Sequence, residues 1–248
     1  MGSLPPEDGS YSFTSPPQPA RFHGFLFDND GTLIDSTAAI VKHWHRIGEE
    51  LGLDPEEVLK TSHGRRSVDT LKLLVPEKAT WEYVCHVEGM IPKLYGQSAV
   101  ELPGSRKLLD DLSALHVPWT IVTSATVPLV TGWLEIMKLS QPPALVTAED
   151  VQNGKPDPEC YALGQKKLGL EGEDKQVLVI EDAPPGVVAG KAAGCKVVAV
   201  HTTYPIDQLI AAGADWIVRD LRSIQVKGID KDTKLVEIEI LDALQIPN

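Results

Sequence analysis

The pattern of apolar and polar positions divides this chain into parts with different periodicity. Residues 21–27 form an apolar run typical of a buried strand, and residues 36–51 show helical periodicity with Ser36 or Thr37 as the expected N-cap. Helical periodicity then continues to about residue 101, broken at glycines and prolines. Beyond Pro103, short apolar runs alternate with helical stretches. The expected strands there are 119–122, 144–146, 177–180, 197–200 and 216–218, and the expected helices are 105–115, 128–138, 158–168, 184–193 and 206–212.

This alternation predicts an α/β fold, because strands that alternate with helices form a mostly parallel sheet with right-handed crossovers. We expect the core to comprise residues 21–35 and 103–248, with residues 36–102 inserted as an all-helical cap domain. The insert leaves the core just after the first strand, so it should lie over the carboxyl edge of the sheet as a lid. Residues 1–20 are rich in Pro, Ser and Gly and predict a flexible tail. Residues 224–248 are uninformative about chemistry.

Composition narrows the class of protein. The chain has 248 residues, 42% of them hydrophobic and 23% charged, as in ordinary globular proteins. A formal net charge of −12 argues against nucleic acid or an anionic membrane as partner. The three cysteines form no CxxC pair, which argues against a zinc site or a disulfide framework. The sequence shows no signal peptide and no membrane-spanning apolar run, so we expect a cytoplasmic protein. We also expect it to be a monomer.

The first candidate site follows the first strand, where Asp28 and Asp30 stand one residue apart. Strand side chains alternate between faces, so both carboxylates should emerge on one side and Asn29 on the other. Ligands of open α/β sheets bind at that carboxyl end. Adjacent carboxylates repel each other unless a cation joins them, and Mg²⁺ is the natural choice. A polar turn at Asp30-Gly31 is the plain alternative.

Three further loops offer polar groups in chain order. Thr123 and Ser124 follow the second strand, Lys155 lies in the loop before a helix, and Glu181 and Asp182 follow the apolar run 177–180. Each alone has a plain alternative, namely a helix cap or a solvated lysine. Together they supply an acid pair, hydroxyl groups, a lysine and a second acid pair.

This order of groups predicts phosphoryl transfer. A carboxylate can attack phosphorus and form an aspartyl-phosphate. Mg²⁺ and Lys155 would neutralise the charge that develops on the phosphoryl group. Asp30 would protonate the leaving alkoxide and then activate water to cleave the intermediate. The partner would then be a small phosphorylated metabolite, selected by the lid.

The chain resembles the haloacid dehalogenase superfamily through FDNDGTLID, IVTSAT, NGKPDPE and VIEDAPPG, which occur in the family's order between residues 21 and 220. SHGRRS and AGKAAGC resemble a narrower branch, the fungal glycerol-phosphate phosphatases and the 2-deoxyglucose-6-phosphate phosphatases. The resemblance implies a Rossmann-like core with a helical cap. It also implies Asp28 as nucleophile and Asp30 as general acid and base.

The same resemblance assigns the remaining groups. Thr123 and the Ser124 amide would hold phosphate oxygens, and Lys155 would lie between the nucleophile and the phosphoryl group. The Asp28 carboxylate and the Asp30 carbonyl would bind Mg²⁺. Asp182, together with Glu181, would complete the metal site directly or through water.

The residues that determine substrate specificity are predicted less sharply. His63, Arg65 and Arg66 in the cap are candidates for reading substrate hydroxyls, with exposed arginines paired to nearby acids as the plain alternative. On this hypothesis Arg66→Ala alters substrate preference. Glycerol phosphate and 2-deoxyglucose 6-phosphate are the leading substrates.

Two other activities and one inactive role are the alternatives to a phosphatase. Dehalogenases of the superfamily lack the second aspartate that is present here as Asp30. Mutases related to β-phosphoglucomutase carry a cap histidine where this chain has Ile40. A catalytically idle protein that binds a metabolite is the remaining alternative.

Overall fold

A computed structural model of the protein describes residues 11–62, 64–172 and 174–245. Its main sheet has the strand order β10-β9-β8-β3-β6-β7, and neighbouring strands are parallel. Every residue of β3, β6 and β8 is buried, because helices cover both faces of such a sheet and leave no polar face. The predicted α/β fold is confirmed. The strands are β3 (Gly24–Phe27), β6 (Trp119–Val122), β7 (Leu145–Val146), β8 (Val177–Glu181), β9 (Lys196–Val200) and β10 (Trp216–Val218).

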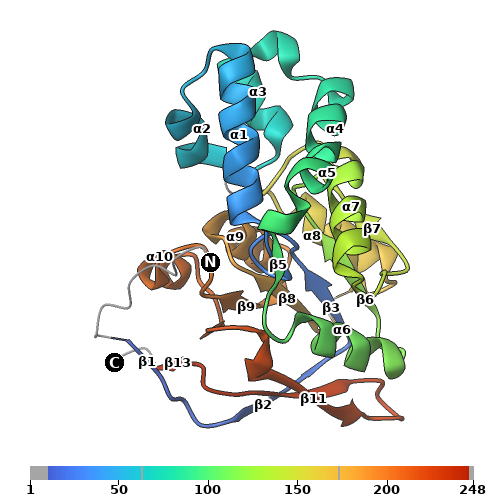
Figure 1. The fold of residues 1–248 in the computed structure, drawn as a ribbon. Coiled ribbons are helices and arrows are strands. Elements are labelled where there is room, and N and C mark those ends of the chain that lie inside the picture. The colour runs from blue at the N-terminus through green and yellow to red at the C-terminus, as the bar shows by residue number, and fades with distance from the viewer. Residues whose placement is uncertain (1–10, 63, 173, 246–248) are drawn as a thin grey trace.

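Helices connect these strands and build two apolar cores, one on each face of the sheet (Figure 1). Phe25 and Phe27 pack into the core that contains Trp133, whereas Leu26 packs into the one that contains Tyr161. This alternation along β3 sets the face from which the next residues project. The helices are α6 (Ser105–Ala114), α7 (Val127–Met137), α8 (Glu159–Lys167), α9 (Pro184–Ala192) and α10 (Ile206–Ala211), with short 3₁₀ turns η1 (Pro76–Lys78), η2 (Gly96–Ser98), η3 (Ala148–Asp150) and η4 (Leu221–Ser223).

The segment between β3 and α6 is helical, as expected, and stands apart from the sheet in Figure 1. It has its own apolar cluster around Trp44, Ile47 and Leu71. Strands β4 (Ile34–Asp35) and β5 (Val100–Glu101) pair antiparallel where the chain leaves and re-enters the core. The division into domains at 36 and 102 stays a prediction. The helices of this segment are α1 (Thr37–Leu51), α2 (Pro55–Ser62), α3 (Ser67–Leu74), α4 (Trp81–Gly89) and α5 (Ile91–Tyr95).

The expected strand 21–27 is two strands in the structure. β2 (Gln18–Phe22) pairs antiparallel with β12 (Val236–Ile240), and β3 begins after a bend at His23 and joins the main sheet. β12 also pairs with β11 (Ile224–Ile229), so residues 224–240, for which no element was predicted, form a hairpin. Its signal was present in the sequence, because buried residues alternate with partly exposed glutamates along β12.

The tail predicted for residues 1–20 also differs in its second half. β1 (Ser12–Phe13) pairs with β13 (Leu244–Gln245), and residues 18–20 belong to β2. Local composition could not reveal this, because both partner strands come from the far end of the chain. Residues 1–10 lie outside the described residues. No helix of the described residues is long and apolar enough to cross a membrane.

Candidate active site

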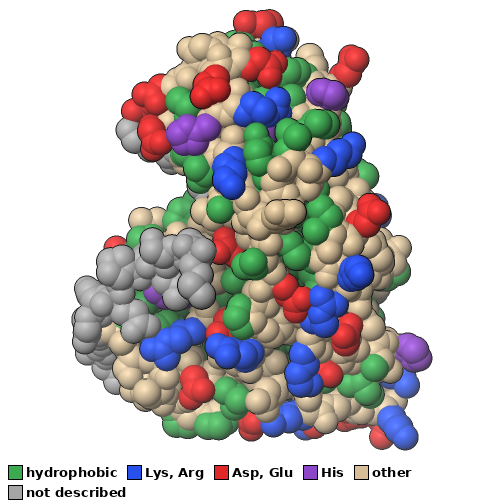
Figure 2. Space-filling model, in the orientation of Figure 1, with side chains coloured by type: hydrophobic (Ala, Val, Ile, Leu, Met, Phe, Trp, Pro, Cys, Tyr) green, Lys and Arg blue, Asp and Glu red, His purple; other side chains and the backbone are tan. Residues whose placement is uncertain are grey.

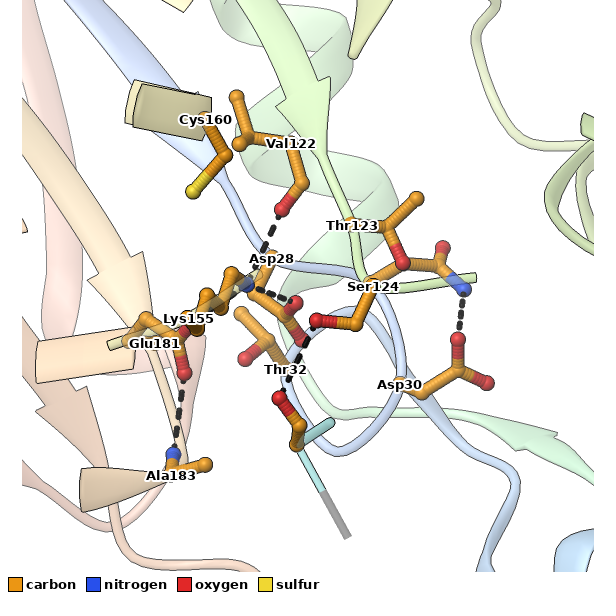
Figure 3. Close-up of polar contacts among 12 residues, drawn as sticks. Asp28, Asp30, Thr32, Val122, Thr123, Ser124, Lys155, Cys160, Glu181 and Ala183 are labelled. Carbon is orange, nitrogen blue, oxygen red and sulfur yellow. Dashed lines mark hydrogen bonds and ion pairs between the residues drawn. The ribbon is translucent and has the colours of Figure 1, made fainter. Parts of the chain in front are cut away.

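Loops that follow β3, β6 and β8 meet the loop that precedes α8 at the carboxyl edge of the sheet (Figure 3). Lys155 Nζ donates to Asp28 Oδ1 at 2.6 Å, to Glu181 Oε1 at 2.6 Å and to the Val122 carbonyl at 3.2 Å. The three charged side chains are buried. Burial alone would lower the pKa of Lys155, but the Asp28 and Glu181 carboxylates raise it above its ordinary value. The structure thus brings together the nucleophile, lysine and second acid pair that the sequence predicted.

Glu181 is held by donors on both carboxylate oxygens. Oε1 also accepts from the Tyr161 hydroxyl at 2.8 Å, and Oε2 accepts from the amides of Asp182 and Ala183 at 2.9 and 3.0 Å. A Cβ at Gly186 would lie 1.7 Å from Oε1, so only glycine fits beside this carboxylate. The contacts fit Glu181 as the residue that orients Lys155. Four hydrogen bonds already occupy the lone pairs of Glu181, and its expected part in the metal site, together with Asp182 and directly or through water, stays a prediction.

The residues present nevertheless fit a divalent cation. Asp28, Glu181 and Asp182 each offer a carboxylate oxygen within 4.8 Å of the others, and all three are buried. Burial and the negative charge of Glu181 raise the pKa of Asp182 to about 7. Burial also raises the pKa of Asp28, although Lys155 opposes the effect. Three carboxylates facing one ammonium group leave an excess of negative charge that a hard divalent ion would offset.

Asp30 lies two residues after Asp28, where the chain enters a tight turn. Its Oδ1 accepts from Ser36 Oγ at 2.6 Å and its Oδ2 from Asn29 Nδ2 at 3.0 Å. Ser36 occupies the N-cap position of α1, yet its side chain makes no cap bond and serves Asp30 instead. Gly31 has φ of 93°, and a Cβ there would lie 2.1 Å from Asp182 Oδ2, so the turn requires glycine. Burial raises the pKa of Asp30, as suits a carboxyl group that carries a proton.

Thr123 and Ser124 follow β6 beside Asp28, as Figure 3 shows. Thr123 Oγ1 accepts from the Ala125 amide at 3.0 Å, which uses a lone pair and leaves the hydroxyl hydrogen to donate. Ser124 Oγ donates to the Gly64 carbonyl at 3.1 Å. The Ser124 side chain therefore ties the core loop to the cap loop, and only its amide is left for the expected phosphate contact.

A cavity of about 90 Å³ lies between these core loops and the helical cap. Asp28, Asp30, Thr123, Ser124 and Asp182 line it from the core. The expectation that the helical insert covers this edge agrees with its position, since helices α1 to α5 contribute to the opposite wall. The cap residues that line the cavity are Ser36, Thr37, Ile40, His43, Trp44, Ser62, Gly64, Arg65, Ser67, Glu88 and Ile91.

The two arginines of the cap loop have different surroundings. Arg65 is exposed and lines the cavity. Arg66 is buried and does not: its guanidinium donates to the carbonyls of Val151 and Gln152 at 2.8 and 2.9 Å and to Asp69 at 2.6 Å. The expected substrate contact of Arg66 is therefore corrected, because its donors are used by backbone and Asp69. His63 lies outside the described residues.

Comparison with known proteins gives the family. The sequence pattern described as "Haloacid dehalogenase-like hydrolase" matches residues 25–200. This chain belongs to that family.

The curated relatives of this haloacid dehalogenase-like hydrolase are phosphatases. Glycerol-1-phosphate phosphohydrolase 1 of Saccharomyces cerevisiae is 40% identical over 238 residues, which cover 93% of this chain and 95% of the relative. 2-deoxyglucose-6-phosphate phosphatase 1 of the same yeast is 36% identical, covering 86% of this chain and 94% of the relative. The predicted family, its narrower branch and the class of phosphomonoester hydrolases are confirmed by these matches.

The fold of the haloacid dehalogenase-like hydrolase also agrees with solved structures. A hydrolase from Pseudomonas syringae superposes with a TM-score of 0.67 and 28% sequence identity, covering 80% of this chain and 94% of the other. The predicted Rossmann-like core with a helical cap is thus confirmed.

Sequence reasoning assigned no role in the site to several polar cap residues that line the cavity, among them His43 and Glu88. Glu88 accepts from Ser67 Oγ at 2.5 Å and from the Thr126 amide at 2.8 Å, and burial raises its pKa to about 7. Helical spacing placed His43 one turn after Ile40, on the face of α1 that looks into the cavity. That spacing was available from the sequence. For Glu88 no local signal existed, because its partners come from α3 and α7.

Proposed function

We propose that this chain is a Mg²⁺-dependent phosphatase that hydrolyses a small polyol or sugar phosphate through a phospho-aspartate at Asp28. The observation that carries the proposal is the buried Lys155, whose ammonium group bridges Asp28 and Glu181 at 2.6 Å each, and both carboxylates line the cavity. A buried carboxylate so oriented is ready to act as a nucleophile. The phosphatases among the relatives support the same reaction.

In the first step, an Asp28 oxygen forms a bond to phosphorus while the bond from phosphorus to the ester oxygen breaks. Asp30 gives its proton to the departing alkoxide. In the second step, Asp30 takes a proton from water, the water oxygen attacks phosphorus, and Asp28 is released with inorganic phosphate. Thr123 and the Ser124 amide hold phosphoryl oxygens, and Lys155 balances their charge.

Asp28 and Asp182 would hold the Mg²⁺ ion, with Glu181 behind them orienting Lys155. When bound, Mg²⁺ supplies charge stabilisation to the phosphoryl oxygens and relieves the repulsion within the acid cluster.

The cavity supports a small substrate. At roughly 10–15 Å³ for each enclosed water, about 90 Å³ corresponds to about six to nine water molecules. A triose-sized alcohol such as glycerol fits this volume better than a hexose. Ile40 lines the cavity at the position where the mutase alternative would have a histidine, which favours hydrolysis over phosphate transfer.

The test is a panel of phosphate esters that includes glycerol 1-phosphate, 2-deoxyglucose 6-phosphate and glucose 1-phosphate. We expect inorganic phosphate release to be fastest with glycerol 1-phosphate, to stop on addition of a chelator and to return with Mg²⁺. Conversion of glucose 1-phosphate to an isomeric sugar phosphate would indicate a mutase. Binding without turnover of any ester would indicate the idle alternative.

A further inference from the structure

The cap wall of the cavity contains buried polar atoms that the proposed reaction does not use. His43 on α1 is 2% exposed, and within the part of the chain that the structure describes neither Nδ1 nor Nε2 has a hydrogen-bond partner. The hydroxyl of Ser62 on α2 is likewise buried without a partner there. Both residues line the cavity. Buried polar groups are normally hydrogen-bonded, so two exceptions around one cavity require an explanation.

Packing alone does not explain a histidine at position 43. Its ring meets Trp44 edge to face at 5.3 Å between centroids. A leucine would fill similar space without burying two unpaired nitrogens, which costs stability. The position therefore carries a polar group at a cost to the folded state, as functional sites commonly do.

The chemistry of the ring points to the kind of partner. Burial, aided by the positive charge of Arg46, lowers the pKa of His43 to about 3, so the imidazole is neutral at physiological pH. A neutral imidazole presents one N–H donor and one acceptor. A hydroxyl group is also both donor and acceptor, whereas a phosphate dianion only accepts.

The position of His43 matches the alcohol part of the substrate. Phosphorus must lie at the core wall, beside Asp28 and Lys155. The alcohol then extends toward the cap, where the face of α1 presents Thr37, Ile40 and His43. Glu88, also on the cap wall, is held by Ser67 and Thr126 and adds a further polar group.

We propose that His43 binds a hydroxyl group of the alcohol part of the substrate and thereby selects polyol phosphates over phosphate esters of plain alkyl alcohols. This proposal rests on the phosphatase activity proposed above and names the residue that sets its specificity. A site built to bond a hydroxyl rejects an analogue that lacks it, because the buried polar groups of the site stay unpaired.

The test compares glycerol 1-phosphate with propyl phosphate, which has the same carbon chain and no free hydroxyl. We expect the wild type to prefer glycerol 1-phosphate strongly in kcat/KM. His43→Leu should lower kcat/KM for glycerol 1-phosphate by about 10- to 100-fold and change that for propyl phosphate by less than about threefold. The preference ratio, and not the absolute rate, is the measured quantity.

Two variants and one further measurement guard against a purely structural effect. His43→Gln keeps a donor and an acceptor and should recover part of the preference. His45→Leu, a partly exposed position on the same helix, should leave both rates unchanged. The thermal midpoint of His43→Leu should equal or exceed that of the wild type, because two unpaired buried nitrogens are removed.

The possible outcomes separate the two proposals. An equal loss on both esters, or an unchanged preference ratio in His43→Leu, would overturn the role of His43 and leave the phosphatase standing. A wild type that releases phosphate from neither ester, with Mg²⁺ present, would overturn both proposals.

Discussion

The core wall and the cap wall of the cavity differ in how their buried polar groups are satisfied. On the core wall, Lys155 joins Asp28 to Glu181, and backbone amides and Tyr161 complete the bonds of Glu181. On the cap wall, His43 and Ser62 have no hydrogen-bond partner among the described residues. His43 and Ser62 are as buried as Asp28 and Lys155, so the contrast between these groups does not come from exposure to solvent.

This contrast separates two tasks of an enzyme. Groups that stabilise a transition state act best when their geometry is fixed before the substrate arrives. Groups that recognise a substrate gain their discrimination from bonds that only the correct substrate completes. On the two proposals above, the first task would fall to loops of the core and the second to helices of the cap.

The largest effect should come from Asp28→Asn, which removes the nucleophile while keeping the shape of the side chain. We expect kcat to fall by about 10⁴-fold or more on every phosphate ester, with the far-ultraviolet circular dichroism unchanged. Asp35→Asn is the matched control, since Asp35 lies in the same segment but is not among the residues lining the cavity. Near-normal hydrolysis by Asp28→Asn would refute the assignment of Asp28 as nucleophile.

A smaller effect is expected from replacing Arg66 or Arg65 by alanine. The two variants test which side chains of the cap face the cavity and which only support the fold. Arg66 braces the cap loop against the loop that carries Lys155, and a Cβ at Gly154 would lie 2.9 Å from Arg66 Nε. Arg66→Ala should therefore lower the free energy of unfolding by about 1–3 kcal/mol and slow all esters about equally.

Arg65→Ala provides the contrast, because Arg65 lines the cavity from an exposed position. It should alter KM for some esters more than for others and leave the denaturation midpoint nearly unchanged. Urea denaturation and a set of ester substrates measure both properties. A change of substrate preference in Arg66→Ala, with stability preserved, would return Arg66 to the role first expected from the sequence.

A further prediction concerns the pH dependence of stability and isolates the contribution of His43 on the cap wall. His43 has its pKa lowered from 6.5 to about 3 in the folded protein. As pH falls below 6.5 the unfolded chain binds a proton that the folded protein refuses until about pH 3, so stability decreases with falling pH. The slope is about 1.4 kcal/mol per pH unit in that window.

The measurement is denaturation of wild type, His43→Leu and His45→Leu at several values of pH between 7 and 4.5. The advantage of His43→Leu over the wild type should grow toward acid, while His45→Leu follows the wild type. If the free energy of unfolding changed with pH in the same way for all three proteins, the lowered pKa of His43 would be refuted.

Much of the core site was predictable, because its residues sit in short motifs directly after strands. Asp28 and Asp30 both line the cavity, as expected, although Asp30 lies in the turn after β3 and not on the strand. Gly31 completes that turn, because a side chain there would strike Asp182. The roles of other residues were not predictable. A glutamate after a buried strand suggests a metal ligand, whereas the four donors around Glu181 in the structure support the proposal that it orients Lys155.

By itself, the sequence determined the order of the strands and helices of the main sheet, the acidic and basic groups at the strand ends and the family, because each depends on local patterns. The tertiary structure alone decided which residues face one another across the cavity. It turned Arg66 toward a backbone loop, buried His43 without a partner and paired β2 with β12 from the far end of the chain. Such contacts join segments separated by up to some two hundred residues, and their energies depend on burial and geometry that no local spacing encodes.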